Sequence, residues 1–137
     1  MARFETKRLP PVADTVAPDG SDVRVLLGLA GGGLAHFALG PGRTSIAVAH
    51  RSVEEIWFFL SGCGEMWRKL GNDEQVVTVD AGVCITIPVH TEFQFRSVGD
   101  EALSAVAVTM PPWPGPDEAY TVKGPWTPTV GPAGRAR

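Results

Sequence analysis

An imidazole and a carboxylate five residues apart, His50 and Glu55, have the clearest capacity for chemistry in this sequence. A histidine beside a carboxylate in an apolar cavity can act as a general acid or base, and both groups can bind a metal ion. The same two side chains can instead form an ion pair that fills the interior of a barrel or orients a loop. Both interpretations place the two groups inside the fold, where burying an ionisable group is costly.

Several apolar side chains are expected on the same strand faces as His50 and Glu55. Because side chains alternate across a strand, Val48 shares a face with His50, and Trp57 shares a face with Glu55. We expect a mainly apolar pocket with one histidine and one glutamate, which is typical of small-molecule sites. The alternative is a barrel interior filled by side chains. The residues predicted to line the pocket are Val48, Trp57, Phe59, Met66, Phe93 and Phe95.

The elements that must position these residues are strands. Sixteen glycines and twelve prolines suit many short strands and do not suit a helical bundle. Turn residues recur at roughly ten-residue spacing, which predicts a sandwich or a barrel. Strands joined by such short turns must be mostly antiparallel. The predicted strands are 23–29, 34–39, 44–50, 55–60, 65–70, 75–79, 83–87, 92–98 and 102–110.

Two stretches, residues 42–62 and 82–97, resemble the two conserved motifs of the cupin family. The first family motif is Gly-x5-His-x-His-x3–4-Glu-x6-Gly, and the second is Gly-x5-Pro-x-Gly-x2-His-x3-Asn. The resemblance covers about residues 34–110 and implies an all-β fold, a small double-sheet jelly-roll barrel. The motif positions that this sequence keeps are His50, Glu55, Gly62, Gly82 and Pro88.

The metal ligands of the family are only partly present. Cupins typically bind a divalent transition metal through three histidines and one glutamate, but Val48 and Phe93 stand at two of the histidine positions. The resemblance therefore implies no certain cofactor and a divalent transition metal only at low affinity. His50 and Glu55 are the remaining ligands, and His90 is a further candidate. We expect His90 to be exposed at the barrel mouth, and the alternative is that it turns inward.

The fold alone does not determine the function, because one fold can carry many activities. The first hypothesis is a small-molecule-binding cupin with an incomplete metal site. The second is a metal-dependent cupin enzyme, such as an isomerase, a dioxygenase or a polyketide-cyclase-like enzyme, that acts on a small organic substrate. In the second case His50 is the acid or base and Glu55 its partner, so both are candidate catalytic residues. His36 is a weaker candidate for any site.

The strand from Ile56 to Leu60 is apolar on both faces, as expected where one sheet packs on a second sheet and also at an interface. Cupins of this size form dimers, so we expect a homodimer. Twelve basic and fifteen acidic residues give a net charge of −3, which offers no general attraction for nucleic acid or an anionic membrane. Two cysteines and an N-terminus without an apolar signal segment predict a cytoplasmic protein.

The two ends differ from the middle in composition. We divide the chain into an N-terminal arm (1–20), a barrel (21–112) and a proline-rich tail (113–137). Trp113 and Trp126 are the expected points at which the tail packs on the barrel or on a partner subunit. Gly131 to Arg137 is expected to be disordered.

Overall fold

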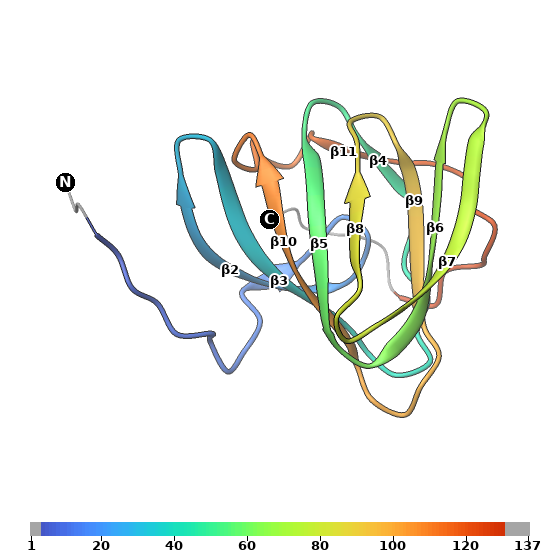
Figure 1. Ribbon diagram of the computed structural model, residues 1–137, viewed down its shortest axis with the longest axis horizontal. Coiled ribbons are helices and arrows are strands. Elements are labelled where there is room, and N and C mark those ends of the chain that lie inside the picture. The colour runs from blue at the N-terminus through green and yellow to red at the C-terminus, as the bar shows by residue number, and fades with distance from the viewer. Residues whose placement is uncertain (1–3, 131–137) are drawn as a thin grey trace.

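A computed structural model of the chain describes residues 4–130, and the disorder expected for 131–137 lies outside these residues. The described residues form eleven strands and no helix, so none of them lies in a helix that could cross a membrane. All strand pairs are antiparallel, and two sheets face each other across one core (Figure 1). The predicted all-β, double-sheet jelly-roll fold is confirmed.

The first sheet has six strands and the second has five. In order across the first sheet these are β1 (Thr15–Val16), β2 (Asp22–Leu29), β3 (Gly32–Leu39), β10 (Leu103–Met110), β5 (Glu54–Ser61) and β8 (Cys84–Ile87). Across the second sheet they are β11 (Ala119–Thr121), β4 (Val48–His50), β9 (Glu92–Ser97), β6 (Cys63–Leu70) and β7 (Asp73–Asp80).

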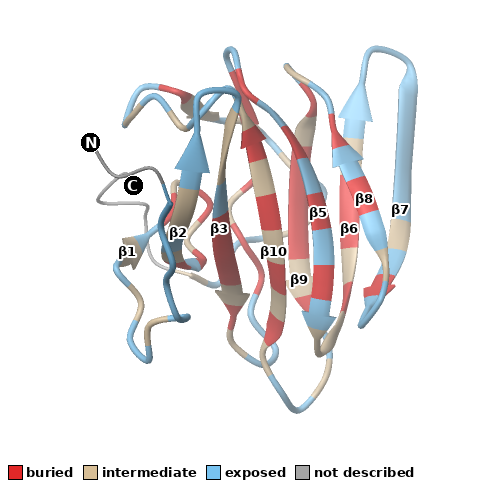
Figure 2. Ribbon diagram, turned by 60° about the vertical axis from the view of Figure 1, so that its left-hand side comes forward, coloured by how far each residue is buried: buried red, intermediate tan, exposed pale blue. Residues whose placement is uncertain are grey.

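Side chains that alternate between two faces along β5 and β10 build the centre of the core. Figure 2 shows buried and more exposed residues taking turns along β5 and β10. On β5 the inward side chains are Glu55, Trp57 and Phe59, all buried, which is the parity predicted from the sequence. The outer face of β5, which the sequence analysis assigned to an interface, is partly exposed in the single chain. There Ile56, Phe58 and Leu60 are 41%, 45% and 43% exposed in the single chain.

Gly62 makes the sharp turn from β5 to β6. Its φ of +79° is in the left-handed region that favours glycine. A Cβ atom there would also lie 2.7 Å from the Cα of Leu103, so a side chain would force the two segments apart. This position is the closing glycine of the first sequence motif, and the turn joins a strand of each sheet.

The predicted strand over 44–50 is regular only over β4. The amide of Ile46 does not pair with a neighbouring strand, because it donates to the carbonyl of Asp19 at 2.8 Å. Only Val48 of β4 pairs in register with β9, at Phe93. The loop before β4 is thereby joined to the N-terminal segment.

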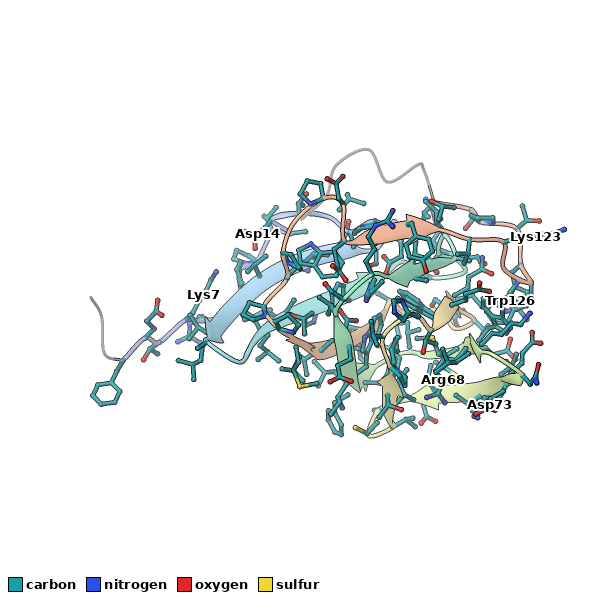
Figure 3. All side chains as sticks on the ribbon, turned by 90° about the horizontal axis from the view of Figure 1, so that it is seen from above. Lys7, Asp14, Arg68, Asp73, Lys123 and Trp126 are labelled. Atoms are coloured by element: carbon teal, nitrogen blue, oxygen red, sulfur yellow. The ribbon has the colours of Figure 1, made fainter. Side chains whose placement is uncertain are left out.

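Both chain ends contribute a strand that the sequence analysis did not predict. β1 lies in the segment assigned to the arm and pairs with β2, while β11 lies in the tail and pairs with β4. Further along the tail, Trp126 lies beneath the guanidinium of Arg96, 4.1 Å from its ring centroid to Cζ. The Trp126 amide also donates to Gln94 Oε1 (3.1 Å), so the tail follows the second sheet (Figure 3).

Candidate functional site

His50 and Glu55 face one enclosed space at one end of the barrel. His50 ends β4 and Glu55 lies near the start of β5, and the turn 51–53 connects the two strands. The two side chains are only 5% and 3% exposed. The residues around the space are Ala17, Pro18, Asp19, Phe37, Val48, His50, Glu55, Trp57, Phe93 and Trp113.

The Glu55 carboxylate is held by a neighbour on its own strand. Trp57 Nε1–H donates to Glu55 Oε1 at 2.7 Å, which fixes the direction of the carboxylate inside the barrel. The Trp57 indole is itself stacked on Phe37, with ring centroids 5.1 Å apart and ring planes 4° from parallel. The aromatic wall therefore also orients the acid.

The His50 imidazole lies between two aromatic edges. The Phe93 ring stands almost perpendicular to it with centroids 5.4 Å apart, and the Trp113 indole does the same at 5.0 Å. Phe93 belongs to the barrel, whereas Trp113 belongs to the tail segment after β10. The tail thus covers the side of the space next to His50.

The enclosed space is small. Its volume is about 10 Å³, which is about the minimum needed for one water molecule. Val48, Trp57 and Phe93 line it, while the other predicted pocket residues Phe59, Met66 and Phe95 pack elsewhere in the same hydrophobic core. Side chains fill the barrel in this conformation, and a pocket large enough for an organic ligand stays a prediction.

The sequence analysis did not predict five residues of this space, and Asp19 is the one ionisable residue among them. The five are Ala17, Pro18, Asp19, Phe37 and Trp113. Asp19 is 5% exposed, and its Oδ1 accepts hydrogen bonds from the amide and the hydroxyl of Ser21, at 2.9 and 2.6 Å. The spacing Asp-Gly-Ser is the available sequence signal, because an aspartate commonly bonds the backbone two residues on in a turn. Nothing local in the sequence indicates that this turn lies against the barrel end.

Glu118 is a third buried acid that the sequence analysis did not single out. Its Oε2 accepts the amides of Ser52 and Val53, at 2.7 and 2.8 Å, and its Oε1 accepts the Ser52 hydroxyl at 2.6 Å. Burial alone raises the pKa of Glu118, but these hydrogen bonds and, less strongly, the charge of His50 bring it below its ordinary value. One tail carboxylate therefore holds the turn that connects His50 to Glu55.

The other two histidines lie outside the space. The His90 side chain is exposed, and its backbone amide donates to the carbonyl of His50 at 3.2 Å. His36 lies on β3 with Arg24 and Val106 as its cross-strand neighbours, on the opposite face of the strand from the lining residue Phe37. Burial, and secondarily the charge of Arg24, lowers the pKa of His36. Neither side chain joins His50 and Glu55 as a ligand in this conformation.

The residues present do not fit a tightly bound cupin metal. Within residues 4–130, no three His, Cys, Asp or Glu side chains come close enough together to hold a metal ion. Val48 and Phe93 are direct cross-strand partners, and both are fully buried. Two apolar side chains thus occupy adjoining positions where family members place imidazoles.

A sequence-family model described as the cupin domain matches residues 35–109, more than half of the chain. The chain belongs to the cupin family. The cupin resemblance stated from the two motifs is thereby confirmed. A search of curated proteins gives no significant match.

Solved structures with the same fold come from proteins of different kinds. Oxalate decarboxylase of Bacillus subtilis superposes with a TM-score of 0.67 at 15% identity, over 80% of this chain and 29% of that one. The capsular polysaccharide assembling protein CapF of Staphylococcus aureus gives 0.65 and 17%, over 89% and 33%. An uncharacterized Klebsiella pneumoniae protein with a double-stranded β-helix domain gives 0.65 and 17%, over 90% and 100%. This cupin spans about a third of the first two proteins, and at such identities the likeness shows the fold alone.

Proposed function

We propose that this cupin binds a small, partly apolar organic molecule at the end of the barrel where His50 and Glu55 meet, without a tightly bound metal. The observation that carries the proposal is the burial of Asp19, His50 and Glu55 around one space with aromatic walls. Ionisable groups are costly to bury, and their concentration at one place is typical of functional sites. A carboxylate and an imidazole offer an acceptor and a donor, and the rings offer apolar contact.

Entry of such a molecule requires the tail to move. The space is too small for an organic ligand while Trp113 stands against His50. Trp113 lies in the segment between β10 and β11, where no residue belongs to a strand. We therefore assign Trp113 the role of a cover, which leaves His50 when the ligand enters.

The second candidate is a metal-dependent cupin enzyme, and one observation favours it. His50 and Glu55 keep their motif positions and face the same space. Mn(II) centres are described for the B. subtilis oxalate decarboxylase, which shares this fold. Val48 and Phe93 count against this candidate because neither can donate an electron pair to a metal.

The indole N–H signals of the four tryptophans give a direct test of the binding proposal. The uniformly ¹⁵N-labelled protein would be screened by NMR against a fragment library of neutral and anionic aromatic and aliphatic compounds. Binding at the proposed site shifts the Trp57 and Trp113 signals in a saturable manner and leaves those of Trp67 and Trp126 in place. Hits that shift only Trp67 or Trp126, or a library without any saturable hit, would contradict the proposal.

We also propose that the protein is a homodimer that pairs through the outer face of the first sheet. Phe58 and Ile56 on β5 are the direct neighbours of Val106 and Val108 on β10, and Leu34 on β3 follows Val108. These side chains form one apolar patch across three strands, and such exposed patches are typical of interaction sites. A second copy suits this patch because a two-fold interface uses the same surface on both subunits.

The expected cytoplasmic location remains part of this proposal. It is supported by two cysteines that form no disulfide with each other, Cys63 half-buried and Cys84 exposed. Reducing compartments favour free thiols. Fractionation of cells that express the full protein, with an assay for both thiols, tests the location.

A further inference from the structure

A second cavity lies where the open edges of the two sheets approach each other. β8 is the last strand of the first sheet and β7 the last strand of the second, and residues from both contribute to the lining. The cavity has a volume of about 150 Å³. Figure 3 labels Arg68 and Asp73, two of its residues, on the β6–β7 hairpin. The polar lining residues are Arg68, Lys69, Asp73, Gln75, Thr86 and Thr91.

Arg68 crosses from one sheet to the other. Its Nη1–H donates to the backbone carbonyl of Thr86 at 2.8 Å, and its Nη2–H donates to Gln75 Oε1 at 3.3 Å. These bonds fix the plane of the guanidinium at the cavity. They use two of its five N–H groups, so donors remain for a further acceptor.

The positive charge at this cavity is not matched by an ion pair. No carboxylate of residues 4–130 lies within ion-pair distance of Arg68. Lys69 also contributes to the lining, but its side chain is on the opposite face of β6 from Arg68, with Glu74 and Glu92 as its cross-strand partners. Burial lowers the pKa of Arg68, and the charge of Asp73 offsets this only in part. An anion beside Arg68 would therefore supply the close opposite charge that this guanidinium lacks.

Thr91 supplies an independent observation. It is 2% exposed, the most buried of the lining residues, and its Oγ1 has no hydrogen-bond partner among residues 4–130. Buried hydroxyls are normally hydrogen-bonded, because leaving one without a partner is costly. A hydroxyl and a guanidinium at one cavity are both donors, and an oxygen anion accepts from both.

We propose that this cavity binds a small carboxylate, held by Arg68 and Thr91. A planar carboxylate matches the fork of a guanidinium, and such charge-assisted pairs are strong. The volume of about 150 Å³ is well above the ~10–15 Å³ that one water molecule needs, which leaves room for a small acid. The site is separate from the space next to His50, since the two linings share no residue. The proposal goes beyond the function proposed above and does not depend on it.

NMR titration of the full chain with sodium pyruvate tests this proposal, with sodium chloride at equal ionic strength as the reference. We expect saturable shifts of the Arg68 side-chain N–H and the Thr91 amide. Arg68→Gln should weaken pyruvate binding by about tenfold or more, since it removes a charge-assisted pair. Arg8→Gln removes the same charge from an exposed position of the N-terminal segment and should leave binding unchanged.

A second variant covers the case in which loss of Arg68 loosens the sheet edges. Thr91→Val keeps the side-chain shape, removes only the hydroxyl, and should weaken pyruvate binding about threefold. Unchanged binding in both variants, or pyruvate shifts no larger than those with chloride, would overturn the proposal. A parallel titration with inorganic phosphate separates the ligand classes, because phosphate binding without pyruvate binding would exclude a carboxylate site.

Discussion

Trp113 covers His50 from outside the barrel, edge against ring, with centroids 5.0 Å apart. Trp113 belongs to the tail, and Glu118 of the same tail accepts hydrogen bonds from the amides of Ser52 and Val53. A segment outside the strands therefore covers the buried histidine.

Replacing Trp113 should expose His50. We expect Trp113→Ala to lower the free energy of unfolding by about 2 kcal/mol, because a half-buried indole is lost. It should also make diethylpyrocarbonate modification of His50 several times faster, as measured by peptide mass spectrometry. Trp126→Ala removes the other tail tryptophan and should leave the His50 rate unchanged. Equal rates in the two variants would show that Trp113 is not the cover.

Glu118 should make stability depend on pH in the acid range. Its pKa is lowered in the folded state, so its contribution is complete above its unfolded pKa and is lost as the pH falls through the folded pKa. Glu118→Gln should reduce the unfolding free energy at pH 7 by about 1–2 kcal/mol. The difference from the unmodified protein should shrink on acidification below the ordinary glutamate pKa. Chemical denaturation over a pH series measures this, with the exposed Glu101→Gln as the control.

The metal content should be low. After dialysis the purified protein should carry well under one equivalent of transition metal, because Val48 and Phe93 replace two ligands. The double variant Val48→His with Phe93→His should raise the content, since the two positions are direct cross-strand partners. Elemental analysis decides between these results. Full, dialysis-resistant occupancy in the unmodified protein would move the metalloenzyme hypothesis ahead.

The oligomeric state should depend on the outer face of the first sheet. Light scattering should give twice the chain mass of 14.6 kDa. Phe58→Asp should yield monomers because it places a charge in the proposed interface. Val76→Asp changes a similarly exposed residue on β7, outside that face, and should remain dimeric. A monomeric unmodified protein at micromolar concentration would exclude the dimer.

The fold could be predicted from the sequence because its signals are local. The spacing of glycine and proline marked the turns. The alternation of side chains along a strand predicted that Glu55 and Trp57 share one face, and the structure places both inward. The strand from Ile56 to Leu60 looked buried on both faces because composition does not show whether a partner covers the outer one.

The rest of the site could not be predicted, because it depends on contacts between distant segments. Glu118 bonds Ser52 and Val53 across about sixty-five residues of sequence, and no local pattern encodes such a contact. Asp19 reaches the barrel end through an irregular turn between β1 and β2. The tail covers the space at His50, and the described part of the tail, residues 113–130, contains one strand of three residues to indicate its course.

The affinity of the strongest fragment hit for two neighbouring glutamate variants tests the central claim most directly. Glu55 faces the enclosed space and Glu54 is exposed on the opposite face of the same strand. Calorimetry should show that Glu55→Gln weakens binding by about tenfold, as expected when a hydrogen bond loses its charge. Glu54→Gln should leave the affinity unchanged. Equal affinities for the two variants would contradict a ligand site at His50 and Glu55.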